Sequence, residues 1–189
     1  MATPASSANA GALPLAGIRV LDMTRVLAGV SLIKHEADST VRNDQSGTAS
    51  YRLFDNNGEL IDRRADVIKI EHPTRGDDTR EWGPPYASYT EESGKQGSGE
   101  SAYFLGVNRN KKSLGLSFQH KAGVDILHKL AKECDVLVEN YLPGSLKKYG
   151  MDYESVAKIN PALIYASITG YGQTGPYSSR AGYDVMVEA

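Results

Sequence analysis

The chain has 189 residues, of which 40% are hydrophobic and 23% are charged, proportions typical of a globular protein of one or two domains. The formal net charge of −2 gives no basic excess, which argues against nucleic-acid binding. Cys134 is the only cysteine, so the chain can form neither an internal disulfide nor a cysteine-built metal site. No apolar run approaches the roughly 18 residues that cross a bilayer, and we expect no membrane segment.

Residues 1–13 are rich in alanine and serine and carry no charge, and we interpret them as a disordered leader before a folded part over 14–189. Their lack of arginine argues against a targeting peptide. The compartment, mitochondrial or cytoplasmic, is therefore left open.

Five short segments predict strands: residues 18–22, 65–71, 113–118, 135–139 and 163–168. Helices are predicted at His120–Lys132, at Tyr153–Ile159 and from Gly182 onward. This alternation predicts an α/β fold, a parallel Rossmann-like sheet with helices on both faces. In such a sheet the strand ends at 22, 71, 139 and 168 converge on one edge, where ligands bind.

Residues 30–64 interrupt this pattern. A helix is expected after the first strand, but the apolar residues here do not recur at helical spacing. Within the segment, Tyr51–Ile61 predicts a small hairpin around an Asn57-Gly58 turn.

The strand at 135–139 is followed directly by Asn140 and Tyr141, and then by a short helix or turn that carries Lys147 and Lys148. An amide, an aromatic ring and two cations at a strand end suit an anionic, flat, polar-edged group such as a nucleotide-bearing cofactor. A solvated loop with two surface lysines is the alternative.

Other motifs indicate less. Gly170–Gly175 satisfies G-x-G-x-x-G, but Pro176 delays any helix, so a mobile loop near a ligand is favoured over a dinucleotide site. The four histidines have no ligand spacing, and we expect no metal site. Asp77 and Asp78, beside Arg75 and Arg80, are either reactive acids or members of an ion-paired loop.

Six ordered segments together resemble the class III CoA-transferases (the CaiB/BaiF-like family), and within it the succinate–hydroxymethylglutarate (glutarate) CoA-transferase branch. Formyl-CoA transferase and the α-methylacyl-CoA racemases are relatives of that branch. The segments are residues 14–29, 65–73, 76–80, 108–113, 138–144 and 167–176. Residues 14–189 would then be the N-terminal part of the family's large domain, interrupted by the atypical insert at 30–64.

The resemblance implies that coenzyme A or an acyl-CoA binds as a substrate, with no permanently bound cofactor and with dicarboxylates as the other small-molecule partners. Lys148 stands where the family often has arginine, which keeps the charge but loses a bidentate fork. The positions that match CoA-contacting positions of the family are Val26, Leu27, Ala28, His72, Val107, Asn108, Arg109, Asn110, Asn140, Tyr141, Leu142, Lys148 and Thr169.

The resemblance also implies a nucleophilic aspartate, which forms an anhydride and then a thioester with the acyl group. That aspartate is expected beyond Ala189, whereas Asp184 matches the proton-transfer aspartate of the racemases and is the catalytic candidate within the chain. The family forms an interlocked homodimer that needs the second half of each chain, so we expect this chain not to form it.

Three functions therefore stay open. The parent protein is expected to move CoA between dicarboxylic acids, from succinyl-CoA to glutarate or hydroxymethylglutarate, with this chain truncated before the nucleophile. A non-catalytic CoA-binding or inert isoform is the second. A racemase-like enzyme that moves an α-proton of an acyl-CoA is the third.

Overall fold

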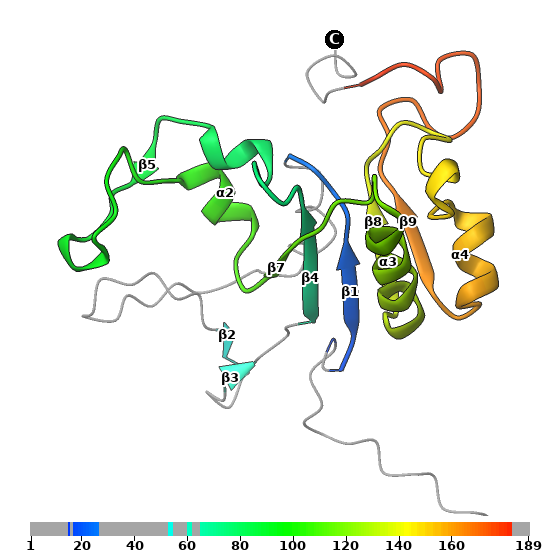
Figure 1. Ribbon diagram of the computed structural model, residues 1–189, viewed down its shortest axis with the longest axis horizontal. Coiled ribbons are helices and arrows are strands. Elements are labelled where there is room, and N and C mark those ends of the chain that lie inside the picture. The colour runs from blue at the N-terminus through cyan, green and yellow to red at the C-terminus, as the bar shows by residue number, and fades with distance from the viewer. Residues whose placement is uncertain (1–14, 16, 27–52, 55–59, 62–64, 183–189) are drawn as a thin grey trace, which may run out of the picture.

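The computed structural model describes residues 15, 17–26, 53–54, 60–61 and 65–182 (Figure 1). The predicted leader, most of the insert at 30–64 and the helix expected beyond Gly182 lie outside these residues. So do three of the predicted site residues, Leu27, Ala28 and Asp184.

A five-stranded parallel sheet forms the centre of the described structure, with the strand order β7-β4-β1-β8-β9. Its strands are β1 (Arg19–Asp22), β4 (Asp66–Glu71), β7 (Lys112–Gly115), β8 (Val136–Glu139) and β9 (Ile164–Ser167). Each overlaps one of the five predicted strands. The central strand β1 places Leu21 beside Ile68 of β4 and Leu137 of β8. The predicted parallel α/β fold is confirmed.

Helices α3 (Lys121–Glu133) and α4 (Tyr153–Ile159) follow β7 and β8 in the chain and lie against one face of the sheet (Figure 1). Leu127 of α3 and Val156 of α4 are fully buried with Leu21 and Leu137 in one apolar cluster. Gly123 allows α3 to begin close to the preceding loop, since a Cβ there would lie 2.0 Å from the carbonyl oxygen of Ser117.

The opposite face of the sheet carries a second, smaller apolar cluster. Val20, Val67 and Val138 are buried there, on three adjacent strands. Successive side chains of a strand point to opposite faces of the sheet, so Val20 and Val138 lie on the face opposite to their neighbours Leu21 and Leu137.

Between β4 and β7 the chain forms a group of short elements on the side of the sheet away from α4 (Figure 1). They are the 3-10 helices η1 (Asp78–Glu81) and η2 (Glu91–Ser93), the antiparallel pair β5 (Tyr86–Ala87) and β6 (Glu100–Ser101), and helix α2 (Ala102–Val107). The Ser101 hydroxyl caps α2 by accepting a hydrogen bond from the Phe104 amide.

Three further elements complete the described structure. The 3-10 helix η3 (Lys147–Tyr149) lies within the short helix or turn predicted after β8. Strands β2 (Leu53–Phe54) and β3 (Leu60–Ile61) form the predicted hairpin, with Phe54 opposite Leu60. A two-residue Asn57-Gly58 turn would pair Phe54 with Ile61, so the observed register differs by one residue. Within the described ranges, no helix combines the length and apolarity that a bilayer crossing demands.

Candidate functional site at the carboxyl edge of the sheet

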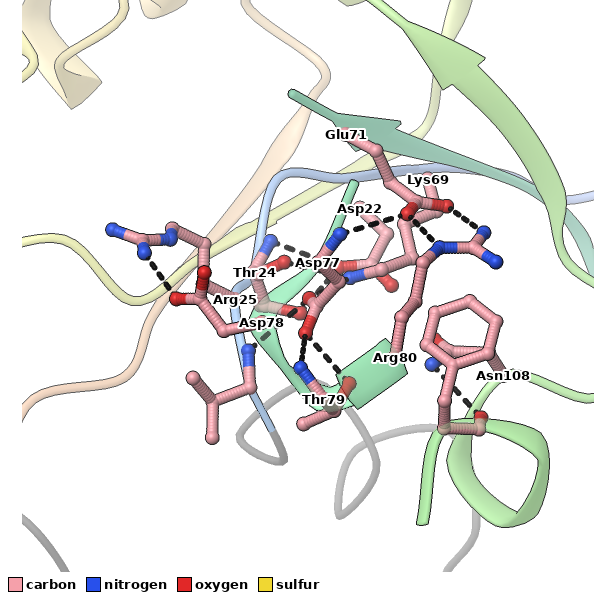
Figure 2. A network of polar contacts seen from close by, with 12 residues as sticks. Asp22, Thr24, Arg25, Lys69, Glu71, Asp77, Asp78, Thr79, Arg80 and Asn108 are labelled. Carbon is pink, nitrogen blue, oxygen red and sulfur yellow. Dashed lines mark hydrogen bonds and ion pairs between the residues drawn. The ribbon is translucent and has the colours of Figure 1, made fainter. Parts of the chain in front are cut away.

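The ends of β1, β4, β8 and β9 meet at one edge of the sheet. All five strands are parallel, so Asp22, Glu71, Glu139 and Ser167 end on the same side (Figure 1). The convergence expected from the sequence is confirmed. Figure 2 shows the polar side chains that gather at the β1 and β4 part of this edge.

Asp22 ends β1 and is completely buried. One carboxylate oxygen accepts hydrogen bonds from the Thr24 amide at 2.9 Å and the Thr24 hydroxyl at 2.6 Å. The other accepts from the Lys111 Nζ at 2.7 Å. The buried charge is thus paired and hydrogen-bonded on both oxygens, as a buried carboxylate requires.

Lys69 lies in the middle of β4, yet its ammonium group is buried at the same edge. Its Nζ donates to the Thr24 carbonyl oxygen at 2.8 Å and pairs with the Asp77 Oδ2 at 3.0 Å. Asp77 also caps η1, since its Oδ1 accepts from the amide and hydroxyl of Thr79. Burial opposes ionisation of Asp77, but the hydrogen bonds from Thr79 and the charge of Lys69 outweigh it and lower the pKa of this carboxyl.

Glu71 ends β4 and holds η1 in place. Its carboxylate accepts two hydrogen bonds from the Arg80 guanidinium, at 2.7 and 2.8 Å, and one from the Ser113 hydroxyl at 2.6 Å. Burial raises the pKa of Glu71, but these donors more than compensate and the pKa is lowered. Arg80 stacks over the ring of Phe104, 3.8 Å from its centroid, which joins α2 to the edge.

The acids Asp77 and Asp78 are therefore members of an ion-paired loop, one of the two interpretations left open by the sequence. Asp78 pairs with Arg25 at the surface. Neither Asp22 nor Lys69 is among the functional residues predicted from the sequence. One feature of the sequence could have indicated Lys69. It lies between two isoleucines in a strand predicted to be buried, and a buried ammonium group needs a polar or charged partner.

Asn140 bridges the ends of β8 and β1. Its Oδ1 accepts from the Arg25 amide and its Nδ2 donates to the Arg25 carbonyl oxygen, both at 2.8 Å. Tyr141, the next predicted residue, packs its ring against Phe118 with the centroids 6.0 Å apart, and burial raises the pKa of its phenol to about 12. The structure brings both residues to the edge, but it turns their side chains toward the protein.

The other predicted residues spread more widely. His72, directly after β4, is exposed and its Nδ1 lies 3.1 Å from the Thr74 hydroxyl. Leu142 is exposed, and Lys148 places its Nζ 4.8 Å from the Tyr149 ring centroid. Thr169 is partly buried two residues beyond β9. Val107, Asn108, Arg109 and Asn110 join α2 to the start of β7, so they lie before a strand and not after one.

A cleft of about 500 Å³ lies at the ends of β8 and β9. Glu139, Tyr165, Ser167 and Gln173 form part of its wall. The Ser167 hydroxyl donates to the Glu139 carboxylate and accepts from the Gln173 side chain, so the glycine loop is tied to both strands. Burial raises the pKa of Glu139, although hydrogen bonds from Ser167 and the Tyr141 amide oppose the shift.

The edge can therefore offer a ligand a fixed turn after β1, exposed basic side chains, and a cleft lined by both polar and apolar residues. No cluster of three or more histidine, cysteine, aspartate or glutamate side chains suited to a metal is found in the described part of the chain. The fold is that of an α/β protein in which polar side chains gather at the carboxyl ends of parallel strands, the place where ligands bind in open α/β sheets.

Comparison with known proteins gives the family. Residues 60–189 match CoA-transferase family III, and the chain belongs to this family. It is 46% identical over 176 residues to succinyl-CoA:glutarate CoA-transferase from Mus musculus, covering 93% of this chain and 33% of that protein. It is 41% identical over 175 residues to succinate–glutarate CoA-transferase from Agrobacterium fabrum, covering 93% and 37%.

A solved structure agrees. The CAIB/BAIF family protein from Brucella suis superposes with a TM-score of 0.68 at 40% identity, covering 92% of this chain and 38% of that one. The chain thus spans about a third of the length of the curated relatives it matches. The family resemblance seen in the sequence is confirmed.

Proposed function

We propose that the protein moves CoA between dicarboxylic acids, from succinyl-CoA to glutarate or a similar acceptor, and that this chain supplies the CoA-binding edge. The observation that carries the proposal is the convergence of the strand ends. It brings together, at the carboxyl ends of the strands, five residues that the family resemblance matches to CoA-contacting positions: Val26, His72, Asn140, Leu142 and Thr169. The 46% identity to a succinyl-CoA:glutarate CoA-transferase supports the choice of substrates.

The chemistry of CoA fits this edge. Its phosphates need basic side chains or hydrogen-bond donors, and the exposed Arg25, His72 and Lys148 follow β1, β4 and β8 in the chain. Its adenine needs an apolar surface, which the exposed Leu142 offers. Its narrow pantetheine arm can pass close to a protein backbone. The turn after β1 offers such a backbone in a fixed position, because Asn140 holds the Arg25 amide and carbonyl groups.

Isotope exchange tests the transfer itself. The parent protein, incubated with succinyl-CoA and labelled succinate, should move label into succinyl-CoA, because a CoA-transferase passes CoA back to its own leaving acid. Label transfer that requires this protein and responds to added glutarate is the expected result. Exchange at the level of a protein-free control would contradict CoA transfer.

Calorimetry with CoA tests the binding half of the proposal separately. A saturable heat with one site is expected. Binding without exchange would leave a CoA-binding protein that is not catalytic by itself, and no heat at millimolar CoA would contradict the CoA-binding edge altogether.

A further inference from the structure

The backbone of the turn Thr24–Val26 after β1 is held by side chains, most of them from distant parts of the chain. Figure 2 shows three of these residues, Asp22, Lys69 and Asp77, around the turn. Its backbone groups bond as follows: Thr24 N to Asp22 Oδ1, Thr24 O to Lys69 Nζ, Arg25 N to Asn140 Oδ1, Arg25 O to Asn140 Nδ2 and Val26 N to Asp77 Oδ2. Five consecutive polar groups of the backbone are thus fixed by four side chains.

This degree of fixation has a physical reason. Val26 has a φ of 62°, a left-handed conformation that is unfavourable for a β-branched residue. Such a conformation is strained and persists only where the surrounding structure holds it. Asp77 accepts from the Val26 amide at 3.2 Å, and Asn140 holds the preceding residue from the other side.

We propose that Asn140 and the Lys69–Asp77 ion pair are positioning residues for CoA: they hold the Thr24–Val26 backbone in the one conformation to which CoA binds, and they do not touch CoA themselves. The assignment rests on the proposed function, since it takes the edge to be the CoA site. It changes the role that the family resemblance gives to Asn140, from a ligand contact to a support for the turn.

The geometry argues against direct contact. Both polar atoms of the Asn140 amide are already used by Arg25. The Asp77 side chain is almost completely buried, with one oxygen bonded to Thr79 and the other shared between Lys69 and Val26. These groups can therefore influence CoA only through the turn.

Asn140→Ala is the first test, and Asn160→Ala is its matched control. Asn160 makes the same kind of bridge away from this edge: its Nδ2 donates to the carbonyl oxygens of Ala131 and Cys134, and its Oδ1 accepts from the Ala162 amide. Both variants lose side-chain to backbone bonds and should shift the urea midpoint similarly. Only Asn140→Ala should raise the Kd for CoA, by about ten-fold or more.

The double variant Lys69→Met/Asp77→Asn is the second test. It removes one charge of each sign, so the net charge near the site is unchanged and a buried unpaired charge is avoided. The Thr24 carbonyl oxygen loses its donor and the Val26 amide loses its ionised acceptor. If these groups act through the turn, CoA binds more weakly in the double variant; if charge alone matters, the Kd stays the same.

Hydrogen exchange in the ligand-free protein separates positioning from contact. In Asn140→Ala the Arg25 and Val26 amides should exchange faster, while in Asn160→Ala they should match the wild type. A weaker CoA affinity with unchanged exchange at these amides would make Asn140 a direct contact and overturn the assignment. Unchanged Kd values in both tests would overturn it as well. A wild-type chain that fails to bind CoA would instead overturn the proposed function, and the positioning role would fall with it.

Discussion

The helix-covered face and the carboxyl edge of the sheet are held together by opposite kinds of interaction. On the face, Leu127, Leu137 and Val156 are fully buried among other apolar side chains. At the edge, Lys69 is only 1% exposed and Asp77 only 4%, so ionised groups occupy positions as buried as the apolar core. The two regions adjoin along the same strands.

This contrast suggests that one region contributes mainly to the stability of the fold and the other mainly to the position of the turn after β1. Apolar burial stabilises the fold by roughly 25 cal/mol per Å² and tolerates small shifts. A buried ion pair gives little net stability compared with an apolar replacement, but it fixes direction through its hydrogen bonds. We infer that the face stabilises the fold and that the edge holds the turn after β1 in place.

Removing one partner of the buried pair should have the largest effect. Lys69→Met leaves the Asp77 carboxylate buried without its cation, and we expect the free energy of unfolding to fall by about 3–5 kcal/mol at pH 7. Urea unfolding measures the loss. Lys69→Met/Asp77→Asn should recover most of this free energy. Equal losses in the single and double variants would show that the unpaired Asp77 charge is not the cause of the destabilisation.

A cavity in the apolar face should come next. Leu127→Ala removes a completely buried side chain between α3 and the sheet, at an expected loss of about 2–5 kcal/mol. The turn at Thr24–Val26 does not contain this residue, so the Arg25 and Val26 amides should keep their protection against exchange under native conditions. Loss of that protection in Leu127→Ala would mean that face and edge unfold together.

Glu139 offers a smaller effect with a definite sign. Its pKa is raised by burial, so the folded state binds more protons than the unfolded state above pH 4.5, and stability falls as the pH rises through this range. Glu139→Gln removes that titration. The new side chain can accept a hydrogen bond from the Tyr141 amide through its oxygen and donate one to the Ser167 oxygen through its nitrogen. The variant should therefore melt at a higher temperature than the wild type at pH 7, and the gain should shrink near pH 4. A lower melting temperature at pH 7 would show that the hydrogen bonds to the carboxylate outweigh its burial.

The smallest effect is expected at the surface of α3. Lys121 pairs with Asp125 one turn later, but both side chains are largely exposed and solvent screens the pair. Lys121→Ala should leave the urea midpoint within experimental error. A clear shift would mean that surface ion pairs contribute more to this fold than the contrast between face and edge allows.

The sequence predicted the fold well because the strands and α3 carry strong local patterns. Each of the five segments predicted as strands overlaps one of the five parallel strands, and the helix predicted at Tyr153–Ile159 has the observed bounds. The edge was predicted only in outline, from the strand ends and the family resemblance. Lys69 donates to the turn after β1, and Asn140 bonds to a residue 115 positions away, so neighbouring residues do not reveal the partner of either side chain. Tyr141 was assigned to a ligand, yet its ring packs on Phe118.

Mapping CoA by hydrogen exchange on the full chain tests the central claim most directly. With CoA added, protection should increase at residues 24–26, at His72 and at 140–142, all at the carboxyl edge of the sheet. Residues 134–135 and 160–163, at the opposite edge, should not change. Protection confined to that opposite edge, or no change anywhere at saturating CoA, would contradict the account.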